Sequence, residues 1–159
     1  MSVEAVSVRQ AIPTDAEAIA RFVIAMAAET EGHHLDPDAT LQAVAAALGD
    51  PDRARYWLAT ADDRPVGQLM ITREWSDWNN AWYWWVQSVY VEPDWRRRGV
   101  YRALYRHALQ QARKAGDVCA LRLYVLTHNE GARRAYEELG MTEEPFRVYE
   151  QRLIEPPGR

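Results

Sequence analysis

The chain reads Arg96-Arg97-Arg98-Gly99-Val100-Tyr101 between an apolar strand pattern and an amphipathic helix pattern. These six residues therefore occupy a helix N-terminus, where unpaired N–H groups carry roughly half a positive charge. Such an end favours Asp or Glu, so three arginines there are best explained by an anion that binds among them. A solvated basic face that also includes Arg102 and Arg106 is the alternative. The stretch predicts a site for a phosphorylated ligand.

Length and composition predict one soluble domain. The 159 residues can bury a complete core, which we expect over about 6–153, with a frayed tail at 155–159. The one cysteine, Cys119, excludes an internal disulfide, and its place at the start of an apolar strand pattern predicts a buried thiol. Neither a secretory signal nor an apolar run of roughly 20 residues is present, so we expect a cytoplasmic protein without a membrane partner. The formal net charge of -4 argues against nucleic acid as a partner.

Hydrophobic periodicity along the chain predicts strands and helices that form an α/β (α+β) fold. The expected elements, in chain order, are a strand at 6–11, a helix from Thr14 with Glu17 completing a capping box, a polar loop at 29–34, a helix from Pro37 to Leu48, strands at 56–60 and 66–73, a loop at 74–80, a strand at 82–91, a helix between Gly99 and Gly116, a strand containing Leu121, Leu123 and Val125, a helix at 130–139 and a last strand at 146–153. A meander followed by strand, helix and strand predicts a mixed sheet with helices on its faces and a right-handed crossover.

Tryptophan is abundant and unevenly distributed, since five of the seven lie between Trp75 and Trp85. Burial in the core explains most of such a group, because large aromatic rings stabilise a fold when they leave water. A pocket wall or a dimer surface is the other interpretation. A homodimer is therefore possible, with Trp78 in the middle of the expected loop.

Two motifs together resemble the GCN5-related N-acetyltransferase (GNAT) superfamily. The first is Arg or Gln, two residues, Gly, one residue, then Gly or Ala; Arg96 and Gly99 match it, and Tyr101 stands at the usual small position. The second is the family's later helix motif, to which this chain is similar at Asn129, Ala132, Tyr136 and Leu139-Gly140-Met141. The resemblance implies one acetyltransferase domain across 1–159 and a mixed, mostly antiparallel sheet that splays where the cofactor binds.

The resemblance also implies acetyl-CoA as cosubstrate. Its pyrophosphate would lie on N–H groups of the turn, because Gly99 has no Cβ and successive amides form an anion-binding concavity. The Tyr101 ring would lie to one side. Backbone groups on the preceding strand would meet the pantetheine amides, and Asn129 would bond the pantetheine arm, although this asparagine also suits a helix N-cap. The expected cofactor-binding residues are Val89, Val91, Arg96, Arg97, Arg98, Gly99, Val100, Tyr101 and Asn129.

Tyr136 follows Asn129 by seven residues, which places both on one helix face. In similar enzymes the tyrosine at this position protonates the departing thiolate. A phenol with a pKa near 10 can share a proton with a thiol near 8.5 at modest cost. The resemblance therefore implies that Tyr136 is the general acid, and a core aromatic residue is the alternative.

The general base has no obvious position. Many relatives carry a glutamate on the strand that here reads Trp85-Val86-Gln87, and Gln87 can position water or substrate but cannot accept a proton at neutral pH. We prefer Glu29 and Glu31, because two carboxylates near a helix end can attract an ammonium group and raise each other's pKa. Surface carboxylates without a catalytic role are the alternative. Further base candidates in the expected loops are Asp77, His33 and His34.

These residues predict an N-acetyltransferase in which a primary amine attacks acetyl-CoA directly within a ternary complex. Nearby acidic and aromatic residues favour a small cationic acceptor, which we expect to contact Trp78, Trp85 and Gln87. No metal is expected, since two adjacent histidines lack further spaced ligands. A noncatalytic acyl-CoA-binding or regulatory module is the alternative, because the strand lacks an acid, and an interaction domain built on the tryptophan loop is another. The acceptor, the base and the oligomeric state stay open.

Overall fold

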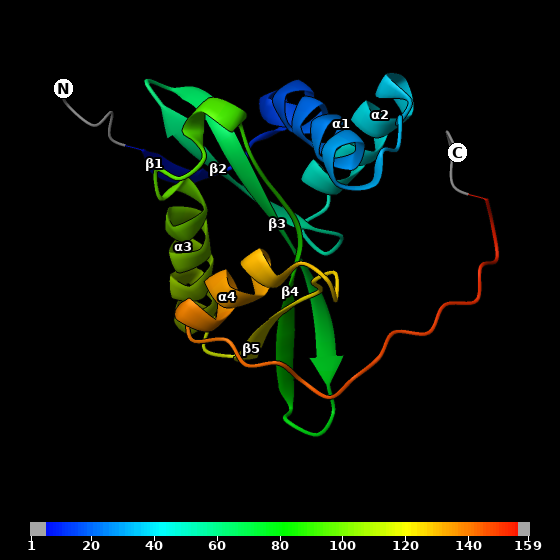
Figure 1. Cartoon of the computed structure of the whole chain (residues 1–159), viewed down its shortest axis with the longest axis vertical. Helices are drawn as coiled ribbons and strands as arrows, with labels where there is room; N and C mark the ends of the chain where they lie inside the picture. Colours follow the sequence, from blue (N-terminus) through cyan, green and yellow to red (C-terminus); the bar gives the residue numbers. More distant parts are fainter. Residues whose placement is uncertain (1–5, 156–159) are drawn as a thin grey trace.

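A computed structural model describes residues 6–155, in which five strands form one sheet ordered β1-β2-β3-β4-β5 (Figure 1). Neighbouring strands from β1 to β4 are antiparallel, whereas β5 lies parallel to β4. The predicted mixed, mostly antiparallel architecture is confirmed. The strands are β1 (Ser7–Gln10), β2 (Arg55–Ala61), β3 (Arg64–Ser76), β4 (Ala81–Val91) and β5 (Val118–Leu123); the helices are α1 (Ala16–Glu31), α2 (Pro37–Leu48), α3 (Val100–Ala115) and α4 (Glu130–Glu138), with short 3-10 turns η1 (Pro13–Asp15) and η2 (Pro93–Trp95).

Helices cover both faces of the sheet, and each face has its own core. The face toward α3 carries the larger cluster, which includes Ala59, Val66, Leu69, Leu104 and Ala108. The face toward α1 and α2 carries a second cluster, which includes Ile19, Phe22, Val44, Leu58 and Tyr90. Because burial of one large apolar side chain contributes roughly 1.5–3 kcal/mol, these two clusters are the main source of stability.

The tryptophans divide between core and surface. Trp57, Trp84 and Trp95 are buried in the α3-side core. Trp75 is 48% exposed, and Trp78 is 95% exposed in the turn of the β3–β4 hairpin. The core interpretation therefore holds for the tryptophans that face α3 and fails for those near the hairpin turn.

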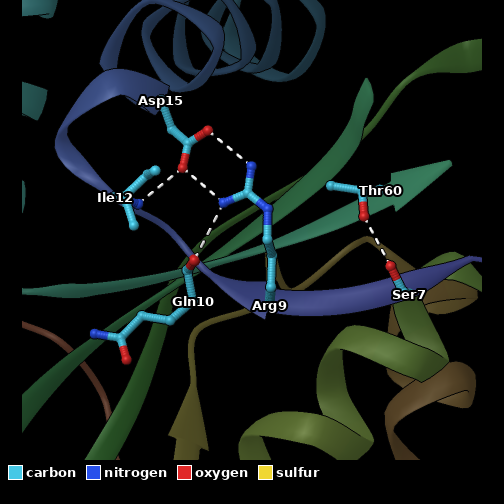
Figure 2. A network of polar contacts seen from close by, with 6 residues as sticks. All are labelled: Ser7, Arg9, Gln10, Ile12, Asp15 and Thr60. Atoms are coloured by element: carbon cyan, nitrogen blue, oxygen red, sulfur yellow. Dashed lines mark hydrogen bonds and ion pairs between the residues drawn. The ribbon is translucent and has the colours of Figure 1, made fainter. Parts of the chain in front are cut away.

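The first helix forms as predicted but begins differently. Thr14 lies in η1, and no side chain caps α1, so the capping box expected from Thr14 and Glu17 is wrong. Figure 2 shows that Asp15 accepts two hydrogen bonds from the Arg9 guanidinium, at 2.8 and 2.9 Å, and one from the Ile12 N–H at 2.8 Å. This bidentate pair fixes the start of α1 to strand β1.

The same helix ends later than predicted. The sequence predicts a loop at 29–34, but α1 continues through Glu31, and Gly32 ends it in the left-handed conformation with a φ of 66°. The Gly32 N–H bonds back to a carbonyl of the last turn, which closes the helix at its C-terminus. Glu29 and Glu31 therefore lie on a helix, and the prediction that they occupy a loop is wrong.

The β3–β4 hairpin is longer than predicted. Residues 74–76 belong to β3, and only 77–80 form the turn. Glu74 pairs with Tyr83, and Trp75 pairs with Trp82, whose ring centroid lies 5.0 Å away. Cross-strand aromatic pairs of this kind stabilise paired strands. The loop predicted at 74–80 from its Asn, Asp and Ser content is therefore too long, because residues 74–76 pair with β4.

The C-terminal part departs most from the predictions. β5 lies at one edge of the sheet, so Cys119 is exposed and the expectation of a buried thiol is wrong; Val125 follows the strand. The predicted strand at 146–153 does not form, and Figure 1 shows this segment running away from the sheet in orange to red. Its residues suit a strand, but a strand needs a paired neighbour, which the segment lacks within residues 6–155. Of the expected tail at 155–159, only Glu155 lies within the described residues.

Among residues 6–155, no helix combines the length and the apolar character that crossing a bilayer requires.

The Arg9–Asp15 pair predicts how stability depends on pH. Hydrogen bonding from Arg9 holds the pKa of Asp15 below its ordinary value, so the pair stabilises the fold above the unfolded-state pKa, near 3.9, and this contribution disappears as the pH falls through the folded-state pKa. Asp15→Asn should lower the free energy of unfolding by about 2 kcal/mol near neutral pH. Urea denaturation at several pH values should show the difference from the parent shrinking below roughly pH 4.

Asp36→Asn provides the control, because Asp36 caps α2 by accepting the Ala39 N–H at 2.7 Å, and asparagine caps a helix equally well. An unchanged stability of Asp15→Asn at neutral pH would contradict the assigned role of the pair.

Candidate functional site

The site begins where two neighbouring strands part. β4 and β5 pair from Trp82 to Val86 of β4, and their pairing ends at Leu123 of β5. β4 continues to Val91 alongside β3. One edge of β4 therefore presents backbone N–H and C=O groups over 87–91 to the space that β5 leaves, and such groups require a hydrogen-bonding partner.

A β-bulge at Gln87 marks the same point of β4. Ile71 of β3 pairs with Val86, and the preceding residue of β3 pairs with Ser88, which leaves Gln87 without a partner in β3. Val86 packs in the α3-side core, whereas Tyr90 packs on the α1 side, although the two are four residues apart. The extra residue shifts the alternation of the strand, as bulges do next to functional sites.

The arginine-rich turn follows the end of β4 after the short 3-10 turn η2. Arg97 has a φ of 63° and Gly99 a φ of 80°, and α3 begins at Val100 without a side-chain cap. Left-handed residues alternating with other conformations turn successive N–H groups toward one point, which makes a concavity for an anion. A Cβ built on Gly99 would meet no atom within 4 Å, so the space beside the turn is open. The turn has the shape and polarity that the sequence predicts for a phosphate site.

The three arginines make different contacts. Arg96 donates to Glu29 at 2.6 Å and to the Val91 carbonyl at 2.9 Å, so its guanidinium lies against the end of α1. Arg98 lies over the Trp95 ring, with 5.1 Å between the guanidinium carbon and the ring centroid. Arg97 is exposed. Only Arg97 and Arg98 are therefore positioned to add charge at the turn without breaking an ion pair.

Glu29, in the last turn of α1, binds both Arg96 and Tyr90. One carboxylate oxygen accepts from Arg96, and the other accepts from the Tyr90 hydroxyl at 3.1 Å. Glu31, two positions along the helix, lies 3.6 Å from the ring of His33 instead. The structure does not bring Glu29 and Glu31 together, because residues two apart on a helix do not face each other.

Tyr136 lies beside the first turn of α3. Its ring centroid is 6.1 Å from that of Tyr101, and the two planes meet at 60°. Burial raises the pKa of Tyr136 above its ordinary value, and burial also raises the pKa of Tyr101. Both phenols therefore stay protonated at neutral pH and can donate a proton or a hydrogen bond. The Tyr101 hydroxyl is buried without a partner among the described residues.

Asn129 is the N-cap of α4. Its carboxamide oxygen accepts the Ala132 N–H at 3.1 Å, as the N-cap interpretation of the sequence predicts. The side chain is exposed, and its NH2 group can still donate to a ligand. The predicted contact with a pantetheine arm stays a prediction.

A group of aromatic side chains lies between the bulge and the hairpin turn, on the sheet face opposite α3, and we call it the aromatic face. It consists of Tyr83, Trp85 and Tyr124. Trp85 stacks on Tyr124 with 4.5 Å between ring centroids. Arg122 lies 3.5 Å from the Tyr83 ring centroid, and Glu74 accepts the Trp85 indole N–H at 2.8 Å. The face combines apolar area with one carboxylate and one guanidinium.

Two polar groups of β3 are not among the residues that the sequence predicts for the site. The sequence predicts Glu74 in a loop, and only the register of β3 against β4 reveals that it shares a face with Tyr83. Gln68 is fully buried and donates to Ser88 at 3.2 Å, while its carbonyl oxygen has no partner among the described residues. Gln68 is the one polar residue in the run 65–71 of β3, and its position between apolar residues of that run is the signal that could have found it.

Other candidate residues lie apart from the bulge. Trp78 and Asp77 occupy the hairpin turn, and six residues of β4 at about 3.3 Å each place that turn roughly 20 Å from Gln87. Gln87 itself is exposed and donates to Thr72 at 3.0 Å. His33 and His34 follow the end of α1. Within residues 6–155, no three His, Cys, Asp or Glu side chains form a group that could hold a metal ion.

An open cavity of about 390 Å³ lies away from the turn and the bulge. It is lined by residues of β2, β4 and the C-terminal end of α3, including Arg55, Trp57, Trp84, Gln111 and Lys114. None of the predicted site residues lines this cavity. The free backbone groups of the turn and of β4 lie elsewhere on the molecule.

Comparison with known proteins points to one family. A model of the acetyltransferase (GNAT) family matches residues 20–141. The structure of a possible acetyltransferase from Clostridium difficile 630 is 38% identical and covers 96% of this chain and 100% of that chain, with a TM-score of 0.89. AAC(6')-Iy in complex with the bisubstrate analog CoA-S-monomethyl-acetylneamine is 20% identical over 94% of this chain and 99% of that chain, with a TM-score of 0.77, which shows a shared fold alone. An uncharacterised N-acetyltransferase of Methanocaldococcus jannaschii is 29% identical over 93 residues, which are 58% of this chain and 41% of that relative, so the match spans less than half of that protein.

Proposed function

This chain belongs to the acetyltransferase (GNAT) family, and from that premise we propose that it transfers the acetyl group of acetyl-CoA to a primary amine. One observation carries the proposal: an uncapped helix N-terminus, preceded by the left-handed residues Arg97 and Gly99, stands at the end of a strand whose neighbour has parted from it. A diphosphate fits the turn, and an amide-bearing chain fits the open edge of β4. Arg97 and Arg98 supply charge for the phosphates.

The reaction we propose is a direct transfer within a ternary complex. The amine nitrogen forms a bond to the thioester carbonyl carbon, and the carbon–sulfur bond then breaks. Tyr136 gives its proton to the departing thiolate; burial raises the pKa of this phenol, so the proton is present at neutral pH. The proton lost by the amine leaves through water to a carboxylate or to solvent.

We propose a small cationic amine as the acceptor, held on the aromatic face. Aromatic rings attract cations, so the stacked rings of Trp85 and Tyr124 favour a cationic group, whereas the Tyr83 ring is already covered by Arg122. Glu74 adds a carboxylate beside Trp85, within the same face as Gln87. Glu74 is the carboxylate we favour for the amine proton, because it lies on the aromatic face, where it accepts from Trp85 and lies 3.8 Å from Arg122; Glu31, beside His33, is the second choice.

The rival function is a noncatalytic acyl-CoA-binding module, which the absence of an acid at 85–87 favours. Acetyl-CoA mixed with a panel of amines, with released thiol as the readout, separates the two. Thiol release that depends on one class of amine supports the transferase. Slow release that no amine accelerates, together with stabilisation by acetyl-CoA, supports the binding module.

Gly99→Glu tests the phosphate turn. The added charge and side chain fill the concavity, so the rise in melting temperature that acetyl-CoA causes in the parent should vanish. Gly116→Glu is a matched control, because Gly116 has a φ of 77° and equally open surroundings at the other end of α3. Both variants should lose about 1–2 kcal/mol of folding stability, because each places a side chain at a left-handed φ. Only Gly99→Glu should lose the rise in melting temperature with acetyl-CoA. A full response in Gly99→Glu would remove the turn from the phosphate site.

Tyr136→Phe tests the general acid. It should lower kcat roughly 100-fold while the affinity for acetyl-CoA changes little, because the lost proton donor acts in the transition state. Tyr56→Phe is the control, since Tyr56 is also a buried phenol with a raised pKa but packs in the α1-side core. Equal losses of kcat and affinity in Tyr136→Phe would instead indicate a packing role.

Glu74→Gln tests the acceptor side. It should raise KM for a cationic amine roughly tenfold, the effect of about 1.4 kcal/mol, and leave the acetyl-CoA melting shift unchanged. Glu92→Gln is the control, because Glu92 pairs with Arg64 at 2.7 Å away from the aromatic face. If both variants give the same KM as the parent, the acceptor does not bind at Glu74.

A further inference from the structure

The open cavity of about 390 Å³ at the C-terminal end of α3 has an aromatic floor. Trp57 of β2 and Trp84 of β4 are the most buried of its lining residues, and their ring centroids lie 5.9 Å apart with the planes tilted by 30°. Cavities that bind small molecules commonly measure roughly 300–1,000 Å³ and are lined by apolar and aromatic side chains. The size of the cavity and its two indole rings therefore suit a ligand with a small, flat, apolar body.

The wall above this floor is positively charged. Arg55 lies over the Trp84 ring, with 5.8 Å between the guanidinium carbon and the ring centroid, and Lys114 of α3 is the other charged residue that lines the cavity. Neither Arg55 nor Lys114 forms an ion pair with a carboxylate among residues 6–155. Two cations without a counter-charge beside an apolar surface attract an anion.

Two acidic residues beside the cavity are already paired with other arginines. Pro51 lines the cavity, and its neighbours in the chain are Asp50 and Asp52. Asp50 binds Arg53 at 3.1 Å, and Asp52 binds Arg73. The charge of each carboxylate is therefore balanced by its own partner, and the cavity keeps its positive excess.

Two carboxamides add neutral donors to the wall. Gln10 ends β1, and Figure 2 shows its side chain extending away from the hydrogen bonds drawn there. Gln111 also lines the cavity, and its amide nitrogen lies 3.4 Å from the His107 Nε2. Burial holds the pKa of His107 below its ordinary value, so this ring is neutral at neutral pH. The NH2 groups of both carboxamides can donate to an anion.

The cavity and the arginine-rich turn lie at opposite ends of α3. Val100 begins the helix directly after the turn, whereas Gln111 and Lys114 line the cavity near its last turn. A rise of about 1.5 Å per residue separates Val100 from Lys114 by roughly 20 Å. A ligand in the cavity therefore occupies a place apart from the proposed acetyl-CoA site.

We propose that this cavity is a second binding site, and that its ligand is an aromatic carboxylate. The ring of such a ligand packs against the two indoles, and its carboxylate lies between Arg55 and Lys114 in charge-assisted hydrogen bonds. A singly charged carboxylate suits the apolar floor better than a phosphate dianion, because taking a larger charge out of water costs more. The proposal goes beyond the transferase reaction, and its test measures binding alone.

Titration with sodium benzoate, followed in proton–nitrogen correlation spectra, tests the site. The indole N–H signals of Trp57 and Trp84 should move and saturate with a Kd on the order of 1 mM, while that of Trp78 at the hairpin turn should stay in place. Benzamide has a similar shape without the charge and should bind at least roughly tenfold more weakly. Equal binding of benzoate and benzamide, movement of the Trp78 signal alone, or no saturation by about 20 mM benzoate would overturn the proposal.

Two substitutions test the charged wall. Arg55→Gln and Lys114→Gln should each raise the Kd for benzoate roughly tenfold, because each removes one charge-assisted hydrogen bond. Arg113→Gln is the matched control, since it removes the same charge from the same end of α3 at a residue that does not line the cavity. If Arg113→Gln weakens benzoate binding as much as Lys114→Gln does, the attraction comes from overall charge and the site is wrong.

Gly99→Glu separates the cavity from the arginine-rich turn, where Arg97 and Arg98 also carry positive charge. The variant should keep the Kd of the parent for benzoate, because the cavity lies at the other end of α3. Loss of benzoate binding in Gly99→Glu would place the anion at the turn and would refute a second site.

Discussion

The parting of β4 from β5 after Val86 is the constraint on which the rest of the molecule depends. A strand inside a sheet has both edges satisfied, whereas the end of β4 keeps one edge open, because no strand within residues 6–155 pairs with it there. The arginine-rich turn follows this strand after η2, and α4 follows β5 along the chain. The same separation therefore brings the uncapped start of α3 and the Tyr136 side chain to one place.

Two arginines hold α1 against the sheet, one near each end of the helix. Arg9 of β1 binds Asp15 just before the first turn, and Arg96 after β4 binds Glu29 in the last turn. The apolar side of α1 supplies most of the docking energy, and the ion pairs fix its position along the sheet. The link from Glu29 to Tyr90 depends on the bulge, because the bulge turns Tyr90 toward α1. Arg96 thus matches the motif that predicts phosphate binding and also holds α1 against the sheet.

Prediction from sequence was most accurate where local chemistry is strong. Two separated motifs predicted the family, which the family model over residues 20–141 confirms. The charge at the start of α3 predicted a phosphate site in the arginine-rich turn, and that site stays a prediction. Prediction was wrong where the structure of a residue depends on the element that pairs with it or on the way its own element ends. Glu74 lies in a strand because Tyr83 lies opposite, Glu31 lies in a helix because Gly32 is available to end it, and Cys119 is exposed because β5 is an edge strand. The segment at 146–153 has the pattern of a strand but lacks a partner within the described chain.

The amino-acid sequence by itself determined the order of helices and strands from β1 to α4, the two apolar faces of the sheet and the glycine that is one of the two left-handed residues of the arginine-rich turn. These follow from backbone conformation and from side-chain periodicity, which act over a few residues. Only the tertiary structure decided the length of the hairpin, the bulge at Gln87, the engagement of Arg96 by Glu29 and the formation of the aromatic face. Each of these depends on contacts between residues distant in the chain, whose energy no local pattern contains.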